Sequence, residues 1–230
     1  MKSRSEASPN SGDRRGGVRR RVHPPAPFAG QSAQGPSSRV HWQGRIPRLR
    51  CEEVTLREIT TDDAASLRRH LADPVVLRHV ATGSTSTAGL EQFARWARAQ
   101  RKRGALICFV IVPIGQSEPV GLMQLWPLEP TAATAEWGVI LGRRYWGTGL
   151  FAAAARLLFD FAFTSLRVRR LEARTTVLNH RANAALHKVG ARADGRLRHA
   201  LQRGSVRSHA FLWSIRGTDV QRRRGARGER

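Results

Sequence analysis

Residues 142–149 combine two arginines with three glycines directly ahead of a long apolar run. We expect that run to form a helix, whose N-terminus presents N–H groups without helical partners and roughly half a positive charge. Gly147 and Gly149 would let an anion approach the backbone closely, while Arg143 and Arg144 add full charges and planar donor groups. The segment therefore predicts a phosphate-binding loop, in preference to a turn that only changes the direction of the chain.

Three known phosphate-binding patterns are candidates for this loop. The nucleotide triphosphate loop is excluded because the sequence contains no G-K-[ST]. Residues 147–152 fit the dinucleotide pattern G-x-G-x-x-G/A, with Glu172 as the acidic residue 25 positions after Gly147. However, residues 142–146 separate this glycine from its strand, and Glu172 lies early in the next predicted strand rather than at its end. The third pattern, R-x-x-G-x-G, is met by residues 144–149 and fits best, which leaves an NAD-dependent dehydrogenase as a distant alternative.

Both helices and strands are expected to position this loop. Residues 134–141 predict the strand before it, and residues 149–166, apolar on nearly every side, predict a helix buried against a sheet. Asn179 and Gly190 are expected to cap a short helix between them. The chain is therefore of the α/β class, with a strand–loop–helix–strand unit over 134–177. The remaining expected elements are helices within 60–73 and 86–104, and strands at 54–59, 105–113, 119–128, near 191–200 and near 205–215.

Composition and charge divide the 230 residues into three parts. Residues 1–50 are rich in Ser, Pro, Gly and Arg, carry a net charge of +9 and hold too few apolar residues for a core. We expect a disordered extension there, acting either as a nucleic-acid-binding arm or simply as a solvated segment. Residues 51–215 carry +10 and form the expected domain, and residues 216–230 carry +4 and form a second disordered tail. So basic a protein is expected to attract anions.

Other classes of protein are disfavoured by what the sequence lacks. Its two cysteines, Cys51 and Cys108, form no CxxC pair, and its eight histidines show no metal-ligand spacing. We therefore expect neither a disulfide scaffold nor a bound metal. No apolar stretch approaches the roughly 18 residues of a membrane span, and the N-terminus lacks the apolar segment of a secretory signal. The expected location is the cytoplasm.

The R-x-x-G-x-G loop is accompanied, within residues 54–215, by three further recognisable blocks in order. The first block is residues 135–141, the strand before the loop. The second is residues 179–191, which place Asn179, Lys188 and Gly190 in the pattern N-x-x-S-x-x-x-x-x-K-x-G-F. The third is residues 194–201, which are similar to E-G-x-L-R. Together they resemble the GNAT acyltransferase superfamily, and the last block resembles its branch of bacterial ribosomal-protein N-terminal acetyltransferases. The resemblance implies a mixed, mostly antiparallel central sheet of six to seven strands, with a splayed central strand and about four helices.

The same resemblance implies how acetyl-CoA would be bound as a cosubstrate. Backbone N–H groups from residue 144 to residue 150 would bind its pyrophosphate, and the end of the preceding strand would pair with the pantetheine amides. Asn179 would hydrogen-bond the pantetheine arm as well as cap its helix, whereas Arg143 either reaches the 3′-phosphate or points into solvent. The residues implied in cofactor binding are Val139, Ile140, Leu141, Arg143, Arg144, Tyr145, Trp146, Gly147, Thr148, Gly149, Leu150 and Asn179.

The implied reaction is attack of a neutral amine on a thioester. It requires removal of a proton from an ammonium, stabilisation of an oxyanion and return of a proton to the thiolate. Glu136, at the start of the splayed strand, is the candidate general base, acting through water, with Glu172 in reserve. Glu136 and Gly138 share one face of the strand, so the carboxylate can face the cleft; the alternative is a salt bridge to a surface arginine. The backbone N–H of Val139 or Ile140 would be the oxyanion donor.

The general acid is the weakest part of the resemblance. Many relatives use a tyrosine after the asparagine block, but the only tyrosine of this chain is Tyr145, in the loop. Ala182 stands where the family often has serine, and Ser208 stands where the branch often has aspartate. His187 lies on the same helix, where a surface histidine is the preferred interpretation. These departures concern acceptor recognition and rate more than cofactor binding.

The implied function is that of an acetyl-CoA-dependent N-acetyltransferase, monomeric or homodimeric. The expected acceptor is a primary amine, either a protein or peptide N-terminus or a small molecule, attacking directly in a ternary complex. A domain charge of +10 disfavours cationic polyamines. The alternative is a catalytically weak acyl-CoA-binding module docked on RNA or ribosomes through its basic tails. Such a module would hold acetyl-CoA without releasing free thiol in the presence of any amine.

Overall fold

The structure is a computed structural model that describes residues 44, 46–80, 84–129, 131–203 and 206–219. Most of the two expected tails, residues 1–43 and 220–230, lies outside these residues. Ile46 is buried, and residues 49–50 form a short strand that pairs antiparallel with Thr55 and Leu56. The folded part therefore begins before the predicted boundary at residue 51, because residues 46–50 pack onto the sheet.

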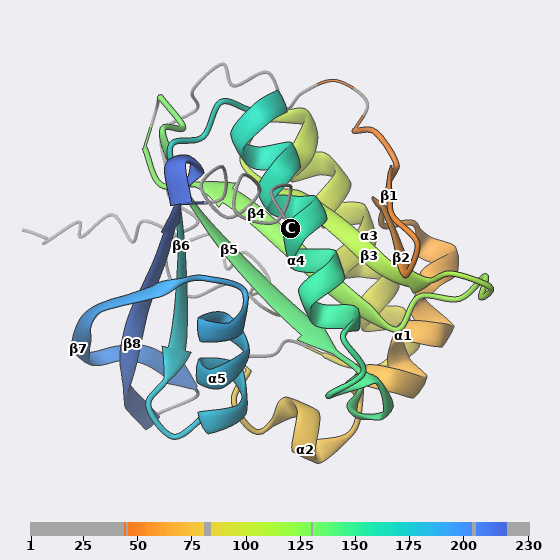
Figure 1. The fold of residues 1–230 in the computed structure, drawn as a ribbon. Helices are drawn as coiled ribbons and strands as arrows, with labels where there is room; N and C mark the ends of the chain where they lie inside the picture. The colour runs from red at the N-terminus through yellow and green to blue at the C-terminus, as the bar shows by residue number, and fades with distance from the viewer. Residues whose placement is uncertain (1–43, 45, 81–83, 130, 204–205, 220–230) are drawn as a thin grey trace, which may run out of the picture.

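One eight-stranded sheet organises the described residues, in the order β1-β2-β3-β4-β5-β6-β8-β7 (Figure 1). All neighbouring strands are antiparallel except β5 and β6, which are parallel. The expected mixed, mostly antiparallel sheet is confirmed, and the additional strand is β1, too short for an alternating pattern to reveal. The strands are β1 (Leu49–Arg50), β2 (Val54–Glu58), β3 (Ile107–Pro113), β4 (Gly121–Pro127), β5 (Thr134–Leu141), β6 (Arg170–Thr176), β7 (Arg192–Arg203) and β8 (Val206–Arg216).

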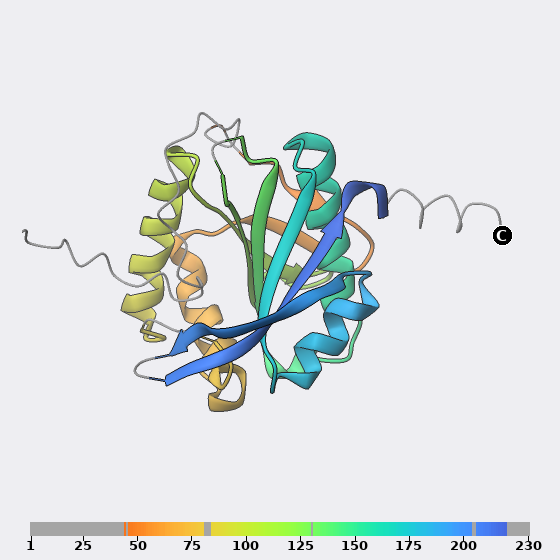
Figure 2. The ribbon, with the colours of Figure 1, turned by 90° about the vertical axis from the view of Figure 1, so that its left-hand side faces the viewer.

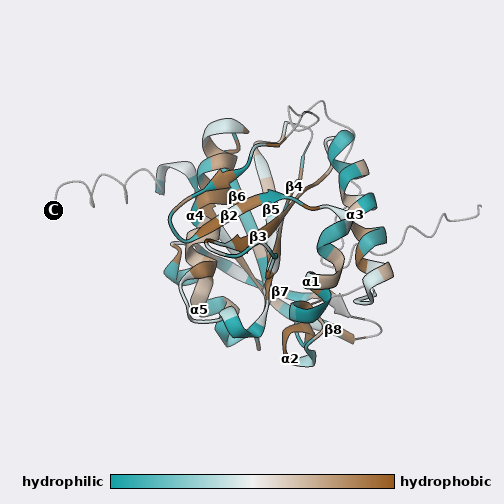
Figure 3. Ribbon diagram, turned by 90° about the vertical axis from the view of Figure 1, so that its right-hand side faces the viewer, coloured by the Kyte–Doolittle hydropathy of each residue, from teal (hydrophilic) through white to brown (hydrophobic). Residues whose placement is uncertain are grey.

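Helices cover both faces of this sheet, as Figures 2 and 3 show from opposite sides. The helices α1 (Ala64–Leu71) and α3 (Thr87–Lys102) lie on one face, and α4 (Leu150–Asp160) and α5 (His180–Lys188) lie on the other. These are the four helices that the sequence predicts. Shorter segments complete the described residues: α2 (Pro74–Leu77), the 3₁₀ turns Thr61–Asp63 and Arg143–Tyr145, and the π-helical turn Phe161–Ser165 that prolongs α4.

The sheet separates two apolar cores. Along β3, Phe109 faces the core that contains α4, whereas Val110 faces the core beneath α1 and α3. Burial on both faces explains why β3 and β4 read as continuous apolar runs rather than as alternating ones. β5 therefore pairs with a strand, β4, that is buried on both of its faces.

The strands β5 and β6 separate after three residue pairs, in which Thr134–Glu136 lies beside Arg170–Glu172. Beyond these pairs, β5 continues along β4 as far as Leu141, and β6 continues along β8 as far as Thr176. The C-terminal ends of the two strands therefore diverge, as Figure 1 shows, and the expected splayed strand is confirmed. The loop after β5 and the start of α5 both lie at this open end.

Candidate active site

The loop after β5 contains two exposed glycines in the left-handed region, Gly147 with φ +79° and Gly149 with φ +88°. A Cβ at either position would meet no atom within 4 Å, so backbone conformation rather than lack of space requires glycine. Gly149 is also the N-cap of α4 and has no side chain to cap it. The N–H of Leu150 reaches the Thr148 hydroxyl only at 3.5 Å, so the start of this helix is weakly capped and its first N–H groups can turn to a ligand.

The backbone donors of the loop fall into two groups. The N–H groups of Tyr145 and Trp146 donate to the carbonyl oxygens of Gly142 and Arg143, at 3.0 and 3.1 Å. Among the residues that the structure describes, no protein acceptor is found for the N–H groups of residues 147–149. Within the predicted set 144–150, this exposed stretch and the first turn of α4 are thus the best placed to bind an anion.

Side-chain contacts fix the same loop on the end of β5. The Tyr145 hydroxyl donates to Oε1 of Gln116 at 3.2 Å, and its ring meets the His70 ring edge-on, with centroids 5.5 Å apart. Nε1 of Trp146 donates to the carbonyl oxygen of Leu141 at 2.8 Å. The one tyrosine of the chain therefore has a structural role in the loop.

Positive charge surrounds the exposed donors. Arg143 and Arg144 are both exposed on the 3₁₀ turn. The guanidinium carbon of Arg181, in the first turn of α5, lies 4.8 Å from the centroid of a Trp146 ring, which is a cation–π contact. Sequence reasoning missed Arg181, because no local pattern relates α5 to the loop.

The two sides of the open end offer backbone and amide groups. Val139 is half-buried and Ile140 and Leu141 are buried, and beyond Glu136 the β6-facing edge of β5 has no strand partner in the described part of the chain. Opposite this edge, Oδ1 of Asn179 accepts from the N–H of residue 182 at 3.1 Å, which confirms the predicted cap of α5. The amide nitrogen of Asn179 has two further donors to offer.

Glu136 lies at the closed end of the splay, with 3% of its side chain exposed, and Nη1 of Arg174 lies 3.0 Å from its Oε2. Burial raises the pKa of Glu136 to about 7; Arg174 opposes this rise and the neighbouring Glu172 adds to it. The expected alternative, a salt bridge to an arginine, is thus present, yet burial outweighs it in setting the pKa. A carboxyl that exchanges its proton near neutral pH has the property that a general base needs.

Glu172, the reserve candidate, lies beside Glu136 in the parallel register of β5 and β6. Nε of Arg170 donates to its Oε1 at 2.8 Å, and Arg170 also pairs with Asp194 of β7. The Glu172 carboxylate is therefore held in a partly exposed ion-pair network, which leaves Glu136 as the better candidate.

Asn183 of α5 is a second residue that sequence reasoning missed. Its Oδ1 accepts from Nε1 of Trp213 at 3.0 Å and from the Thr175 hydroxyl, and its Nδ2 donates to the carbonyl oxygen of Thr176 at 3.2 Å. It therefore joins α5 to β6 and β8 along one wall of the open end. An asparagine inside a helix gives no local signal of such a role.

The other predicted proton donors lie apart from the candidate base. His187 is exposed on α5, and Ser208 is half-buried on β8. No hydrogen bond joins either residue to Glu136 within the described residues. In the same part of the chain, no cluster of His, Cys, Asp or Glu is arranged to hold a metal, and no helix is long and apolar enough to cross a membrane.

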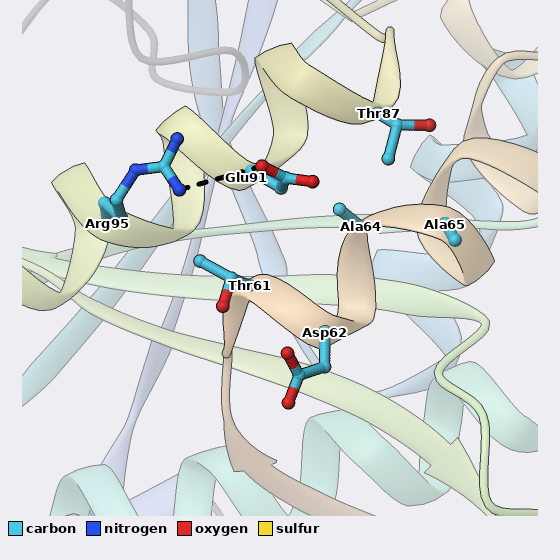
Figure 4. A pocket seen from close by; sticks show the side chains of 7 residues that line it. All are labelled: Thr61, Asp62, Ala64, Ala65, Thr87, Glu91 and Arg95. Atoms are coloured by element: carbon cyan, nitrogen blue, oxygen red, sulfur yellow. Dashed lines mark ion pairs between the residues drawn. The ribbon is translucent and has the colours of Figure 1, made fainter.

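A separate cavity of about 340 Å³ lies between the start of α1 and the helix α3 (Figure 4). Thr61, Asp62 and Thr87 contribute to its lining, as does the ion pair of Glu91 and Arg95, whose charged atoms are 3.7 Å apart. None of its lining residues belongs to β5, β6 or the glycine loop. This cavity is therefore no part of the candidate active site.

The candidate site thus combines a splayed parallel strand pair, a weakly capped helix N-terminus and a buried acid. Residues 53–192 match the family model described as an acetyltransferase (GNAT) domain. The chain therefore belongs to the GNAT acetyltransferase family and is an N-acetyltransferase; the family uses acyl-CoA as its donor.

Individual relatives agree with this family. The chain is 28% identical over 151 residues to an uncharacterized N-acetyltransferase p20 from Bacillus licheniformis, covering 65% of this chain and 85% of that protein. It is 32% identical over 82 residues to the spermidine N(1)-acetyltransferase of Escherichia coli K12, covering 36% of this chain and 44% of that enzyme.

Solved structures share the fold. RimJ from Mycobacterium smegmatis, in complex with CoA-disulfide, superposes with a TM-score of 0.69 at 24% identity, covering 78% of this chain and 90% of RimJ. A ribosomal-protein-S5-alanine acetyltransferase from Vibrio fischeri gives a TM-score of 0.67 at 17% identity, covering 76% of this chain and 98% of that enzyme.

Proposed function

We propose that this N-acetyltransferase moves an acetyl group from acetyl-CoA to a protein or peptide N-terminus. The observation that carries the proposal is that β5 presents Glu136 at one end and an exposed glycine loop at the other. Among the described residues, the β6-facing edge of β5 between them has no strand partner. A donor thioester lying along that edge would meet a base near its reacting end. The solved structures titled as ribosomal-protein acetyltransferases support a peptide N-terminus as the acceptor.

Acetyl-CoA is proposed to bind along β5 from the loop inward. The N–H groups of residues 147–150 would take the pyrophosphate, with Arg143 and Arg144 supplying charge. Backbone groups of Val139–Leu141 would pair with the pantetheine amides, and Asn179 would donate to the arm from the opposite side. The CoA-disulfide held by RimJ supports a coenzyme site in a protein of this fold.

Chemistry is proposed at the closed end of the splay. Glu136 would accept a proton from the acceptor ammonium through water, and the neutral amine would attack the thioester carbonyl. The N–H of Val139 or Ile140 would stabilise the oxyanion. As the carbon–sulfur bond breaks, the second proton lost by the nitrogen would pass to the thiolate. We propose that the domain performing this reaction spans residues 46–216, slightly more than the expected 51–215.

A small cationic amine is a second candidate acceptor. The match to a spermidine N(1)-acetyltransferase favours it, although that match spans 44% of the enzyme's length. The +10 charge of residues 51–215 opposes it, because a basic surface repels a polyamine. Peptides and polyamines must therefore be tested side by side.

The direct test is release of free thiol by the full-length protein given acetyl-CoA and one acceptor at a time. Peptides with free and with blocked N-termini form one matched pair, and spermidine forms the polyamine arm. We expect thiol release with the free peptide and none with the blocked one. Tight acetyl-CoA binding without thiol release for any amine would overturn the proposal and favour the binding module, whose proposed RNA contacts would lie in the tails.

A further inference from the structure

Three polar side chains lie buried together near the point where β5 separates from β6: Gln124, Trp126 and Glu136. We call these three residues the polar cluster. Their exposed fractions are 2, 5 and 3%. Within the described residues, no well-oriented hydrogen bond meets Oε1 or Nε2 of Gln124, Nε1 of Trp126 or Oε2 of Glu136. The Trp126 indole lies close enough to Glu136 to lower the pKa of that carboxyl, Gln124 lies beside the Cys108 thiol, and Arg174 forms an ion pair with Glu136. Leaving such groups unsatisfied costs about 1–3 kcal/mol each, so native proteins nearly always supply a partner.

The strand register places these groups on one face of the sheet. Trp126 lies opposite Glu136, and Gln124 lies opposite Gly138, so the cluster occupies two adjacent rows of β4 and β5. This is the face beneath α1 and α3, because Leu122 and Ile140, two residues further along each strand, belong to that core. The cluster therefore lies on one side of the sheet at the root of the splay.

Room for a small partner exists above Gly138. A Cβ built there would meet only the Trp126 ring, at 3.6 and 3.8 Å. The backbone of Gly138 is not in the left-handed region, so its conformation alone does not require glycine. The carbons that border this space are Cη2 and Cζ3 of Trp126, at the edge of the ring away from Nε1. Gln124 lies opposite Gly138 in the strand register, so a water in this row would take its hydrogen bonds from the Gln124 amide.

We propose that Gln124 and Trp126 are positioning residues that hold water against Glu136 and thereby form the proton relay of the acetyl transfer. The proposal rests on the proposed function and adds to it the path by which a buried base reaches its substrate. With 3% of its side chain exposed, Glu136 is too enclosed to contact an acceptor amine directly.

The acceptor ammonium gives one proton to the nearer end of the relay while a different proton passes from the relay water to Glu136. The neutral amine then attacks the thioester, and its second proton goes to the departing thiolate. Glu136 afterwards releases its proton, so one proton leaves per acetyl group transferred. The charged groups that face Glu136 are Arg174 and Glu172, both from β6.

The test is Gln124→Met in the full-length protein, which replaces the amide by an apolar chain of similar shape. Because an orphaned buried amide is removed, the melting temperature is expected to hold or rise. At the same time kcat should fall about 10- to 100-fold, since an assisted proton transfer is lost. The acid limb of the kcat profile should move to higher pH, because fewer hydrogen bonds would stabilise the charged form of Glu136. Acetyl-CoA affinity should not change.

Two further variants keep the test decisive. Gly138→Ala fills the space beside Trp126 at ordinary contact distance, so it should fold, lower kcat and shift the same limb. Met123→Leu, whose side chain lies in the opposite core, is the matched control and should leave kcat and the pH profile unchanged.

Unchanged kcat and pH profile in Gln124→Met would overturn the relay alone, provided that the wild type releases thiol. Parallel loss of melting temperature and activity would also overturn it, because the amide would then be structural. A wild type that releases no thiol with any acceptor would overturn the proposed function itself, and the relay with it.

Discussion

The two ends of β5 are built in opposite ways. At its C-terminal end, the loop of residues 147–149 exposes backbone donors and is bordered by arginines. Near its N-terminal end, Glu136 is buried among side chains contributed by β4 and β6, and its pKa is raised to about 7. We propose that the C-terminal end binds an anion and that the N-terminal end exchanges a proton.

Anion binding and proton exchange require different surroundings in a protein. Binding an anion needs donors that solvent can reach, and a helix N-terminus with glycines supplies them from consecutive residues. Holding a carboxyl near neutrality needs burial that outweighs a nearby arginine, and only a folded sheet supplies that. Substitutions in the loop should therefore leave the pKa of Glu136 unchanged, and substitutions at Glu136 should leave acetyl-CoA binding unchanged.

The largest expected effect is on catalysis, from Glu136→Gln. The amide cannot accept the ammonium proton, so kcat should fall between about 10² and 10⁴-fold, and the limb of the pH profile near 7 should disappear. Steady-state thiol release across pH 5.5–9 measures both. Glu172→Gln is the matched control, since its carboxylate is held by Arg170, and it should lose far less. Equal losses in the two variants would contradict the assignment of the base.

The next effect is on acetyl-CoA, from Gly147→Asp. The new residue would be strained at φ +79° and would place a negative charge beside a pyrophosphate, so the KM for acetyl-CoA should rise about 100-fold. Gly147→Ala separates the two causes, because space is open there and only the strain applies. An aspartate variant that behaves like the alanine variant would show that no anion binds at this loop.

A smaller effect is the pH dependence of stability. Between pH 4.5 and about 7 the folded protein keeps Glu136 protonated while the unfolded chain releases that proton. The contribution of this group to the free energy of unfolding therefore falls as pH rises through this window, by about 3 kcal/mol in total. Glu136→Gln lacks this slope, so in denaturant titrations it should gain on the wild type between pH 4.5 and 8. A difference independent of pH would contradict the raised pKa.

The smallest effect is structural, from Asn183→Ala. The change leaves the buried Nε1 of Trp213 without its acceptor, which should cost about 1–3 kcal/mol of unfolding free energy. Because α5 is held less firmly against β6, a modest rise in the KM for acetyl-CoA should follow. Chemical denaturation checks the first expectation, and unaltered stability would show that the joint is dispensable.

The two ends of β5 also differ in how well the sequence predicts them. The glycines of the loop and the cap at Asn179 could be found because their signals lie within a few consecutive residues. The splayed strand and the mostly antiparallel sheet came from the family resemblance and are confirmed. Gln124 and Arg181 were missed, since each gains its neighbours only when distant strands and helices meet. The strand β1 was missed because two residues carry no period.

The measurement that tests this account most directly is calorimetric titration of acetyl-CoA into the full-length wild type, Gly147→Asp and Glu136→Gln. We expect the wild type and Glu136→Gln to bind with affinities within about threefold of each other, a difference of less than 1 kcal/mol. Binding by Gly147→Asp should be too weak to detect under the same conditions. Retained binding in Gly147→Asp, or lost binding in a folded Glu136→Gln, would contradict the separation of the two ends of β5.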